Sequence, residues 1–218
     1  MTNEDREQRA ADAVEAGARL GNRECESALR ELDELAAEQR ADEALRSGQH
    51  EIALRELLVL ADRGSVYALL ALGYMCETGA AGTPDMAAAR SYYERAADAG
   101  SASACFELGR VLRAEGEETK ARVMLQAGAE RGDMSCMSRL GQMLMEGRGG
   151  PADRVSGRAW LEKAAAQGHV FARRTLLGLE ARDASSMFEK LSVKMKILSL
   201  ARQAAGEMLK DPESDKLR

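Results

Sequence analysis

The chain has 218 residues, a formal net charge of −5 and an isoelectric point near 5.3. This acidic balance argues against binding to nucleic acid, because contact with the phosphate backbone requires a basic surface. Hydrophobic residues make up 45% of the chain but aromatic residues only 4%, a composition that favours closely packed helices over sheets built around aromatic side chains.

The amino-terminal residues 1–32 predict charged capping helices. Their opening stretch, MTNEDREQRAADAVEAGARL, lacks the apolar segment of a secretion signal. No run in the chain approaches about eighteen apolar residues, the length that spans a membrane. We therefore expect a cytoplasmic protein that makes no contact with a membrane.

A repeating pattern follows over residues 33–180. Its units end near Gly64, Gly100, Gly132 and Gly168, which are spaced 36, 32 and 36 residues apart. Four residues after each glycine comes a small side chain, and eight residues after it comes a leucine, namely Leu72, Leu108, Leu140 and Leu176. Because residues four apart lie on one face of a helix, the pattern predicts a repeated pair of helices in which this face is buried.

Each first helix also contains a glycine close to its leucine in the repeat pattern. Gly73, Gly109 and Gly141 directly follow the buried leucine, and the fourth unit carries Gly178 one residue later. Such a glycine permits close approach of the second helix. The loops GAAGTPD and GRGGPAD then lead to Asp85 and Asp153, which are candidate N-caps of the second helices. The second loop lacks the GxGxxG and GK[ST] patterns, so we interpret it as a connection rather than a phosphate-binding loop.

The segments ALLALGYMCETGAAGTPDMAAARSYYERAADAG (68–100) and CMSRLGQMLMEGRGGPADRVSGRAWLEKAAAQG (136–168) resemble the Sel1-like repeat, a relative of the tetratricopeptide repeat. A degenerate unit precedes them at about 33–64. The resemblance implies an all-α, right-handed α-solenoid of antiparallel helix pairs that works in protein–protein interaction. Residues 181–210 then predict a carboxy-terminal capping or partner helix, because solenoid ends need a cap, and residues 211–218 a charged tail.

In the tetratricopeptide-type arrangement that the chain resembles, the first helices line a concave groove. Its positions fall three, six, ten and thirteen residues after each terminating glycine, off the buried face. Aromatic, aliphatic and arginine side chains gather there, as in protein interfaces. The predicted partner-binding residues are Tyr67, Leu70, Tyr74, Glu77, Phe106, Arg110, Arg113, Gln142, Met145, Phe171 and Arg174, and the same positions hold Ser103, Ser135 and Ser138.

No pattern of catalytic or metal-binding residues stands out. The four cysteines form no CxxC pair, and neither of the two histidines has a nucleophile or a cysteine at motif spacing. His50 and His169 fall at helix starts or turns, where we expect exposed side chains. Cys105 and Cys136 fall at small-residue packing positions, where buried and unreactive thiols are expected. We therefore expect no enzyme activity, no metal and no cofactor.

Three functional hypotheses remain open. The first is a non-enzymatic scaffold or adaptor whose groove binds a peptide or helix with acidic and apolar residues. The second is a bacterial immunity-type inhibitor that plugs the active site of a toxin or effector, a role that the resemblance allows. The third is a self-associating scaffold, with a homodimer formed through residues 187–209, where apolar side chains occupy more than one face of the predicted helix.

Overall fold

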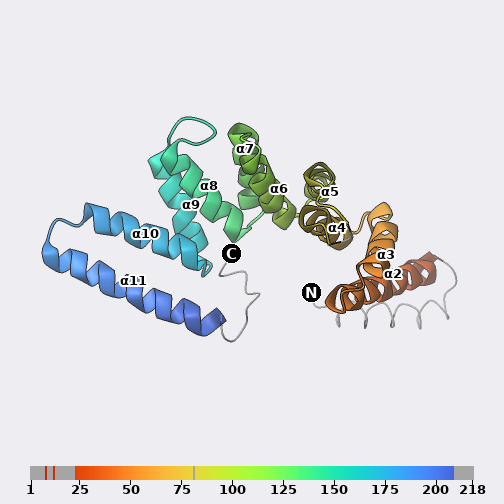
Figure 1. Ribbon diagram of the computed structural model, residues 1–218. Coiled ribbons are helices and arrows are strands. Elements are labelled where there is room, and N and C mark those ends of the chain that lie inside the picture. Colours follow the sequence, from red (N-terminus) through yellow and green to blue (C-terminus); the bar gives the residue numbers. More distant parts are fainter. Residues whose placement is uncertain (1–7, 9–11, 13–22, 81, 209–218) are drawn as a thin grey trace. The chain divides into compact units, whose positions relative to one another are not determined.

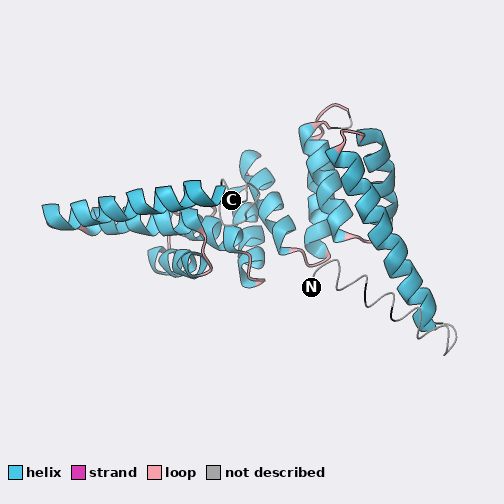
Figure 2. Cartoon of the chain, turned by 90° about the horizontal axis from the view of Figure 1, so that it is seen from below, coloured by secondary structure: helices cyan, strands magenta, loops and turns pink. Residues whose placement is uncertain are grey.

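The structure is a computed structural model, in which residues 8, 12, 23–80 and 82–208 are described. Every regular element in these ranges is a helix (Figure 2). The chain divides into two compact units, Met1–Ala99 and Gly100–Arg218. Most of the predicted amino-terminal cap and the whole predicted tail, 211–218, lie outside the described residues.

Four helices are described in the first unit. They are α2 (Arg23–Arg46), α3 (His50–Asp62), α4 (Val66–Thr78) and α5 (Met86–Asp98), and each packs against the next (Figure 1). A core of large side chains holds them together, including Leu57, Leu60 and Tyr93, all of which are buried. Helix α2 runs without interruption past residue 32, where the sequence analysis places the end of the cap.

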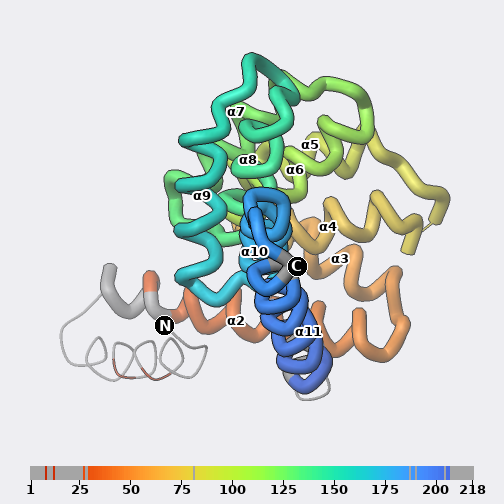
Figure 3. The backbone as a smooth tube through the Cα atoms, turned by 90° about the vertical axis from the view of Figure 1, so that its left-hand side faces the viewer, coloured from red at the N-terminus to blue at the C-terminus, as the bar shows by residue number. Residues whose placement is uncertain are grey.

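The second unit continues the same alternation. Its helices are α6 (Ala102–Ala114), α7 (Glu118–Glu130), α8 (Met134–Glu146), α9 (Arg154–Ala166), α10 (Val170–Asp183) and α11 (Met187–Met208). Each helix packs against the next, and α6 also contacts α8 directly. The backbone path through α8, α9 and α10 can be followed in Figure 3. The predicted all-α fold of helix pairs is therefore confirmed.

The glycines at the predicted ends of the repeating units share a left-handed backbone conformation. Gly64, Gly100, Gly132 and Gly168 each follow the second helix of a pair and have φ angles between 87° and 98°. This left-handed conformation reverses the chain and suits glycine, which has no Cβ to clash. The same local signal therefore marks the ends of α3, α5, α7 and α9.

The predicted buried face of the first helices is confirmed in three units and displaced in the fourth. The small residues Ala68, Ala104, Cys136 and Ala172 are all 0% exposed, and Leu72, Leu108 and Leu140 are buried. In α10, however, Leu177 is buried while Leu176 is only half-buried. The prediction of Leu176 was wrong by one residue, because α10 packs against α11 through a cluster of Leu177, Val193 and Leu200.

The two long connections have matching geometry. Gly79 and Gly147 both end their helices with φ 71°. The predicted N-caps are confirmed, since a carboxylate oxygen of Asp85 accepts from the Ala88 amide at 2.9 Å and that of Asp153 from the Ser156 amide at 3.0 Å. Their shared sequence pattern thus reflects a shared structure.

The glycine-rich loop at residues 147–153 packs against α7. Arg122 Nη1 donates a hydrogen bond to the Pro151 carbonyl oxygen at 3.1 Å. Gly149, with φ 70°, lies so close to the Glu118 carbonyl that no Cβ would fit there. The glycines therefore serve close packing and chain reversal, which supports their interpretation as a connection between helices.

Candidate functional site

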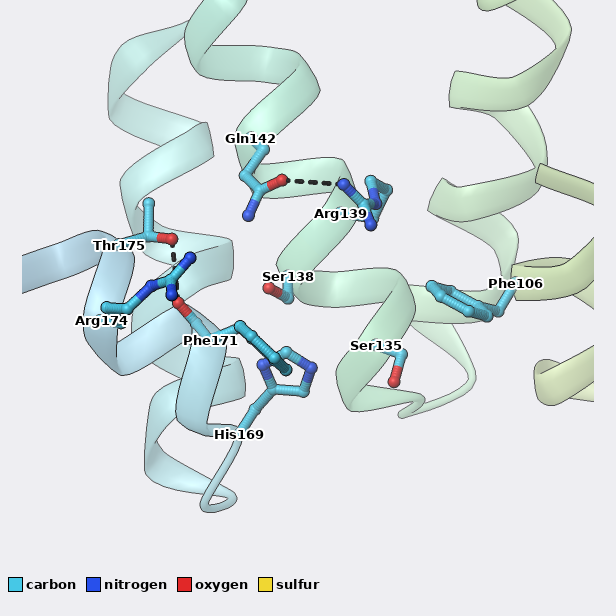
Figure 4. Close-up of a pocket in the computed structure, with 9 residues that line it drawn as sticks. All are labelled: Phe106, Ser135, Ser138, Arg139, Gln142, His169, Phe171, Arg174 and Thr175. Carbon is cyan, nitrogen blue, oxygen red and sulfur yellow. Dashed lines mark hydrogen bonds between the residues drawn. The ribbon is translucent and has the colours of Figure 1, made fainter. Parts of the chain in front are cut away.

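The first helices of the second unit, α6, α8 and α10, line a common pocket with a volume of about 460 Å³ (Figure 4). Because these helices begin successive pairs, their equivalent positions face the same side. The lining residues are Phe106, Ser135, Ser138, Arg139, Gln142, His169, Phe171, Arg174 and Thr175.

Four of the predicted partner-binding residues meet in this pocket. They are Phe106 from α6, Gln142 from α8, and Phe171 and Arg174 from α10. Ser135 and Ser138, which occupy equivalent repeat positions, line it as well. The spacing rule that was drawn from the terminating glycines therefore gathers residues from three helices, and their role in binding stays a prediction.

Three lining residues, Arg139, His169 and Thr175, were not among the predicted groove positions. Arg139 and Thr175 lie seven residues after the terminating glycine, one position beyond the predicted sixth. Positions three, six, seven and ten follow the i, i+3, i+4, i+7 spacing of a single helix face. The complete helical spacing would therefore have found Arg139 and Thr175.

Arg139 is a cation held in a partly desolvated and positively charged place. Its Nη1 donates to Gln142 Oε1 at 3.2 Å, and it forms no ion pair with the described residues. Burial lowers the pKa of Arg139, and the nearby charges of Arg113 and Arg148 lower it further. Such a guanidinium stays protonated at neutral pH and gains from any anion that reaches it.

Aromatic rings and a second guanidinium form the α10 side of the pocket. The Arg174 guanidinium carbon lies 5.4 Å from the centre of the Phe171 ring, within the range of a cation–π contact. The His169 ring centre lies 6.1 Å from that of Phe171, with the two planes inclined at 56°. Figure 4 shows the three side chains side by side.

His169 differs from its predicted exposed state. The side chain is 2% exposed and caps the amino end of α10, where Nδ1 accepts a hydrogen bond from the Ala172 amide at 3.1 Å. The prediction of an exposed histidine was wrong because a capping side chain folds back onto the first turn of its helix.

Arg110 and Arg113, although predicted as groove residues, do not line this pocket. Arg110 Nε lies 2.9 Å from Glu107 Oε2 on the same helix, and Arg113 Nε lies 3.9 Å from Glu118 Oε2. Both guanidinium groups therefore have carboxylate neighbours within their own repeat. Met145 lines an adjoining pocket together with Gln142 and Arg174.

The predicted residues of the first unit lie on α4 in differing environments. The Tyr67 hydroxyl donates to Asp42 of α2, and burial followed by this contact raises the pKa of Tyr67 above its ordinary range. Leu70 is half-buried, and Glu77 accepts a hydrogen bond from the Tyr93 hydroxyl at 3.2 Å. Tyr74 alone among these four is strongly exposed, at 63%.

The cysteines at the predicted packing positions are buried. Cys105 is 1% exposed and Cys136 is 0% exposed, and neither forms a disulfide. Arg131 Nη1 lies 2.9 Å from Cys105 Sγ. Burial raises the pKa of Cys136, and the charge of Asp133 raises it further. Both effects favour the protonated thiol, and the low reactivity of this cysteine stays a prediction.

The described residues hold neither a cluster of metal ligands nor a membrane-spanning helix. No group of three or more histidine, cysteine, aspartate or glutamate side chains in these residues is arranged to hold a metal ion. None of the described helices is both long enough and apolar enough to cross a membrane.

Comparison with known proteins identifies the repeats. The family described as Sel1 repeat matches residues 66–101 and 135–169. A search of curated proteins finds no match to this sequence. The first match covers α4 and α5, and the second covers α8 and α9, which are the two pairs with the long glycine-rich connection.

Solved structures with the same fold are also found. One is a Sel1 repeat protein from Oxalobacter formigenes, with 29% identity, a TM-score of 0.58, and coverage of 70% of this chain and 49% of that one. Another is c5321, a protective antigen present in uropathogenic Escherichia coli strains that displays an SLR fold. It has 21% identity, a TM-score of 0.60, and coverage of 68% of this chain and 33% of that one.

The present chain thus spans half or less of the length of either relative. Sel1 repeat proteins generally serve as scaffolds for protein interaction. The two matched repeats, the helix pairs and the related structures agree with the resemblance in the sequence, and the chain contains Sel1 repeats at residues 66–101 and 135–169.

Proposed function

We propose that the protein is a non-enzymatic interaction scaffold, and that the pocket between α6, α8 and α10 binds a partner peptide by one acidic and one apolar side chain. The observation that carries this proposal is the pair Arg139 and Arg174. Both guanidinium groups line the pocket, and neither forms an ion pair with the described residues.

A carboxylate is the group that best complements these arginines. The guanidinium fork matches the two oxygens of a carboxylate, and hydrogen bonds between ionised groups are stronger than neutral ones. Arg139 is already partly desolvated, and the charges of Arg113 and Arg148 each act on it more strongly than the opposing charge of Glu146, so an incoming anion adds a favourable interaction. The hydroxyl groups of Ser135 and Ser138 supply further donors to such a ligand.

An apolar side chain completes the recognition. Phe106 and Phe171 line the pocket from α6 and α10, and Phe171 is 39% exposed. An aliphatic or aromatic side chain that covers these rings removes apolar surface from water, at about 25 cal/mol per Å². Aromatic and arginine side chains of this kind dominate the binding energy of protein interfaces.

The geometry favours binding over catalysis in this pocket. Ser135 and Ser138 lie near His169, as in a nucleophile–base pair, but the Nδ1 atom of His169 already accepts the Ala172 amide hydrogen bond. That nitrogen is the acceptor of an N-cap and does not take a proton from serine.

Tyr74, in the first unit, offers a separate exposed ring that we include among the partner-binding residues.

The experiment is selection of binding peptides from a random phage library. The library is panned on the full chain, on the Arg139→Gln/Arg174→Gln variant, and on Arg55→Gln, which removes an exposed cation of α3 outside the pocket. We expect wild type and Arg55→Gln to enrich peptides with acidic and apolar residues, and the double variant to retain at least tenfold fewer of them. Equal retention by the double variant would exclude this pocket as the binding site.

A second candidate function, self-association, is favoured by α11. Its side chains Phe188, Leu191, Met195 and Leu198 are 82%, 57%, 61% and 49% exposed. Their spacing of three, four and three residues places them along one face of the helix, while Val193 and Leu200 pack inward. Sedimentation of wild type and Leu191→Ser/Met195→Ser tests this role, since a homodimer through residues 187–209 would dissociate in the variant. The immunity-type role and the cytoplasmic location stay predictions.

A further inference from the structure

A second pocket, with a volume of about 630 Å³, adjoins the first and lies between α8, α9 and α10. The two pockets share Gln142, Arg174 and Thr175, so one groove continues into the other. The guanidinium groups of Arg154 and Arg158 line it from α9, and those of Arg174 and Arg182 from α10.

Most of the positive charge in this second pocket is not neutralised by the protein. Arg158 is paired with Glu162, at 3.0 Å. By contrast, Arg154, Arg174 and Arg182 form no ion pair with any described residue. Two carboxylates also line the pocket, Asp183 and Glu146, and the latter lies 3.6 Å from Arg148 outside it. The pocket is therefore a locally basic site on a chain whose net charge is −5.

One face of α10 connects the two pockets. Phe171, Arg174, Gly178 and Arg182 are spaced by three, four and four residues, so they lie in a row along the helix. Phe171 and Arg174 line the first pocket, and Arg174, Gly178 and Arg182 line the second. Apart from the adjoining backbone of α10 and the chain neighbours of Gly178, no described atom would lie within 4 Å of a Cβ at Gly178, so the space over the middle of this row is open.

We infer that this row of α10 residues binds a second acidic residue of the same partner peptide, three or four residues away from the first. The inference rests on the proposed function. Eight residues of helix separate Arg174 from Arg182, which corresponds to about 12 Å along the axis. An extended peptide advances about 3.3 Å per residue and covers this distance in three or four residues.

The row also fixes where the apolar residue belongs. Phe171 lies three residues from Arg174, about 4.5 Å along the helix axis and on the side away from Arg182. The apolar side chain therefore stands next to the first acidic residue and outside the acidic pair. Between the two acids, small side chains fit best, because the peptide backbone passes over the open surface at Gly178.

The test uses fluorescein-labelled, capped synthetic peptides and fluorescence anisotropy with the full chain. The two-acid probes are Phe-Glu-Ser-Ser-Glu and Phe-Glu-Ser-Ser-Ser-Glu. The comparison probes are Phe-Glu-Glu-Ser-Ser, a peptide with six serines between the acids, and the single-acid Phe-Glu-Ser-Ser-Ser. Each is made in both chain directions. We expect the two-acid probes, in one direction, to bind about tenfold more tightly than the comparison probes, the gain typical of one charge-assisted contact.

Two variants assign the second acid to its place. Arg182→Gln should weaken the two-acid probes to the affinity of the single-acid probe and leave the single-acid probe unchanged. Gly178→Gln places a side chain in the open space above the helix and should weaken the two-acid probes at least tenfold. Its thermal unfolding is measured alongside, so that a folding defect is told apart from a blocked groove. Arg55→Gln again serves as the matched charge control.

The outcomes separate this inference from the proposed function. If the single-acid probe binds as tightly as the two-acid probes and Arg182→Gln changes neither, the second acidic contact is overturned while the first pocket stands. The same conclusion follows if Arg174→Gln weakens the binding of every probe but the affinity does not depend on the spacing of the acids. If no probe binds in either direction, the proposed function is overturned, and this inference with it.

Discussion

Alanine substitution at two equivalent glycines should change stability in opposite directions. Gly141 of α8 and Gly178 of α10 both follow the buried leucine of a first helix. A Cβ at Gly141 would lie 2.8 Å from the Gly157 carbonyl oxygen and 2.8 Å from Leu161 Cγ, whereas a Cβ at Gly178 would meet no atom within 4 Å. The facing residue on α9 is also a glycine, Gly157, so the backbones of α8 and α9 are in contact where the two helices cross.

The magnitude follows from two effects. Replacing glycine by alanine inside a helix stabilises it by about 1 kcal/mol, and both variants share this gain. Only Gly141→Ala also forces an extra carbon against a neighbouring backbone, which costs about 1–3 kcal/mol. The two variants should therefore differ by about 1–3 kcal/mol, with Gly178→Ala more stable than wild type by about 1 kcal/mol.

Urea unfolding followed by circular dichroism measures this difference, and the midpoint and slope are compared for both variants and wild type. In thermal unfolding, Gly178→Ala should raise Tm by about 2–4 °C. A Gly141→Ala protein as stable as Gly178→Ala would refute the claim that this glycine exists for close helix contact. A destabilised Gly178→Ala would show that the space above α10 is not open.

Three further outcomes are expected. Leu108→Ala, a deletion in the core of α6 at a residue 3% exposed, should cost about 2–5 kcal/mol in urea unfolding. Asp133→Ala removes the carboxylate that accepts from the Cys136 amide at 2.6 Å and should cost about 1 kcal/mol as the loss of an N-cap. Cys105 and Cys136 should react slowly with a thiol reagent even at pH 9, because burial raises the pKa of Cys136 and little reactive thiolate forms. Rapid labelling of both in the native protein would contradict their burial.

Under the proposed function, the basic groove in the second unit would let an acidic protein bind acidic partners specifically. Net negative charge repels polyanions from most of the surface. Acidic groups are therefore attracted only to places where arginine side chains form no ion pair with a carboxylate. Arg139 and Arg174 are such places, whereas Arg110 lies 2.9 Å from Glu107 and is neutralised locally. Added salt should therefore weaken peptide binding, while binding to the aromatic rings persists.

The sequence predicted which helix faces line the pocket, but it did not predict every residue of the lining. The spacing from the terminating glycines placed Phe106, Gln142, Phe171 and Arg174 around one pocket, because each repeat presents the same helix face. The same rule also selected Arg113, which lies near Glu118 instead. Position along a helix depends on local sequence, but the pairing of a long charged side chain depends on what the next helix offers.

The sequence by itself determined the helix pairs, their ends and most of their buried face. Those features arise from contacts within a few residues: a left-handed glycine after Ala99, a carboxylate cap at Asp85, a small residue and a leucine four apart. In a repeat protein each unit packs only on its neighbours, so local rules suffice for the fold.

Only the tertiary structure decided the details that concern function. It buried Leu177 in place of Leu176, because Leu177 packs against Val193 and Leu200 of α11. It turned His169 inward as a helix cap, and it left Arg139 without an ion pair among the described residues, close to the charges of Arg113 and Arg148. These outcomes depend on contacts between helices far apart in sequence, where spacing along the chain carries no information about the distance between side chains.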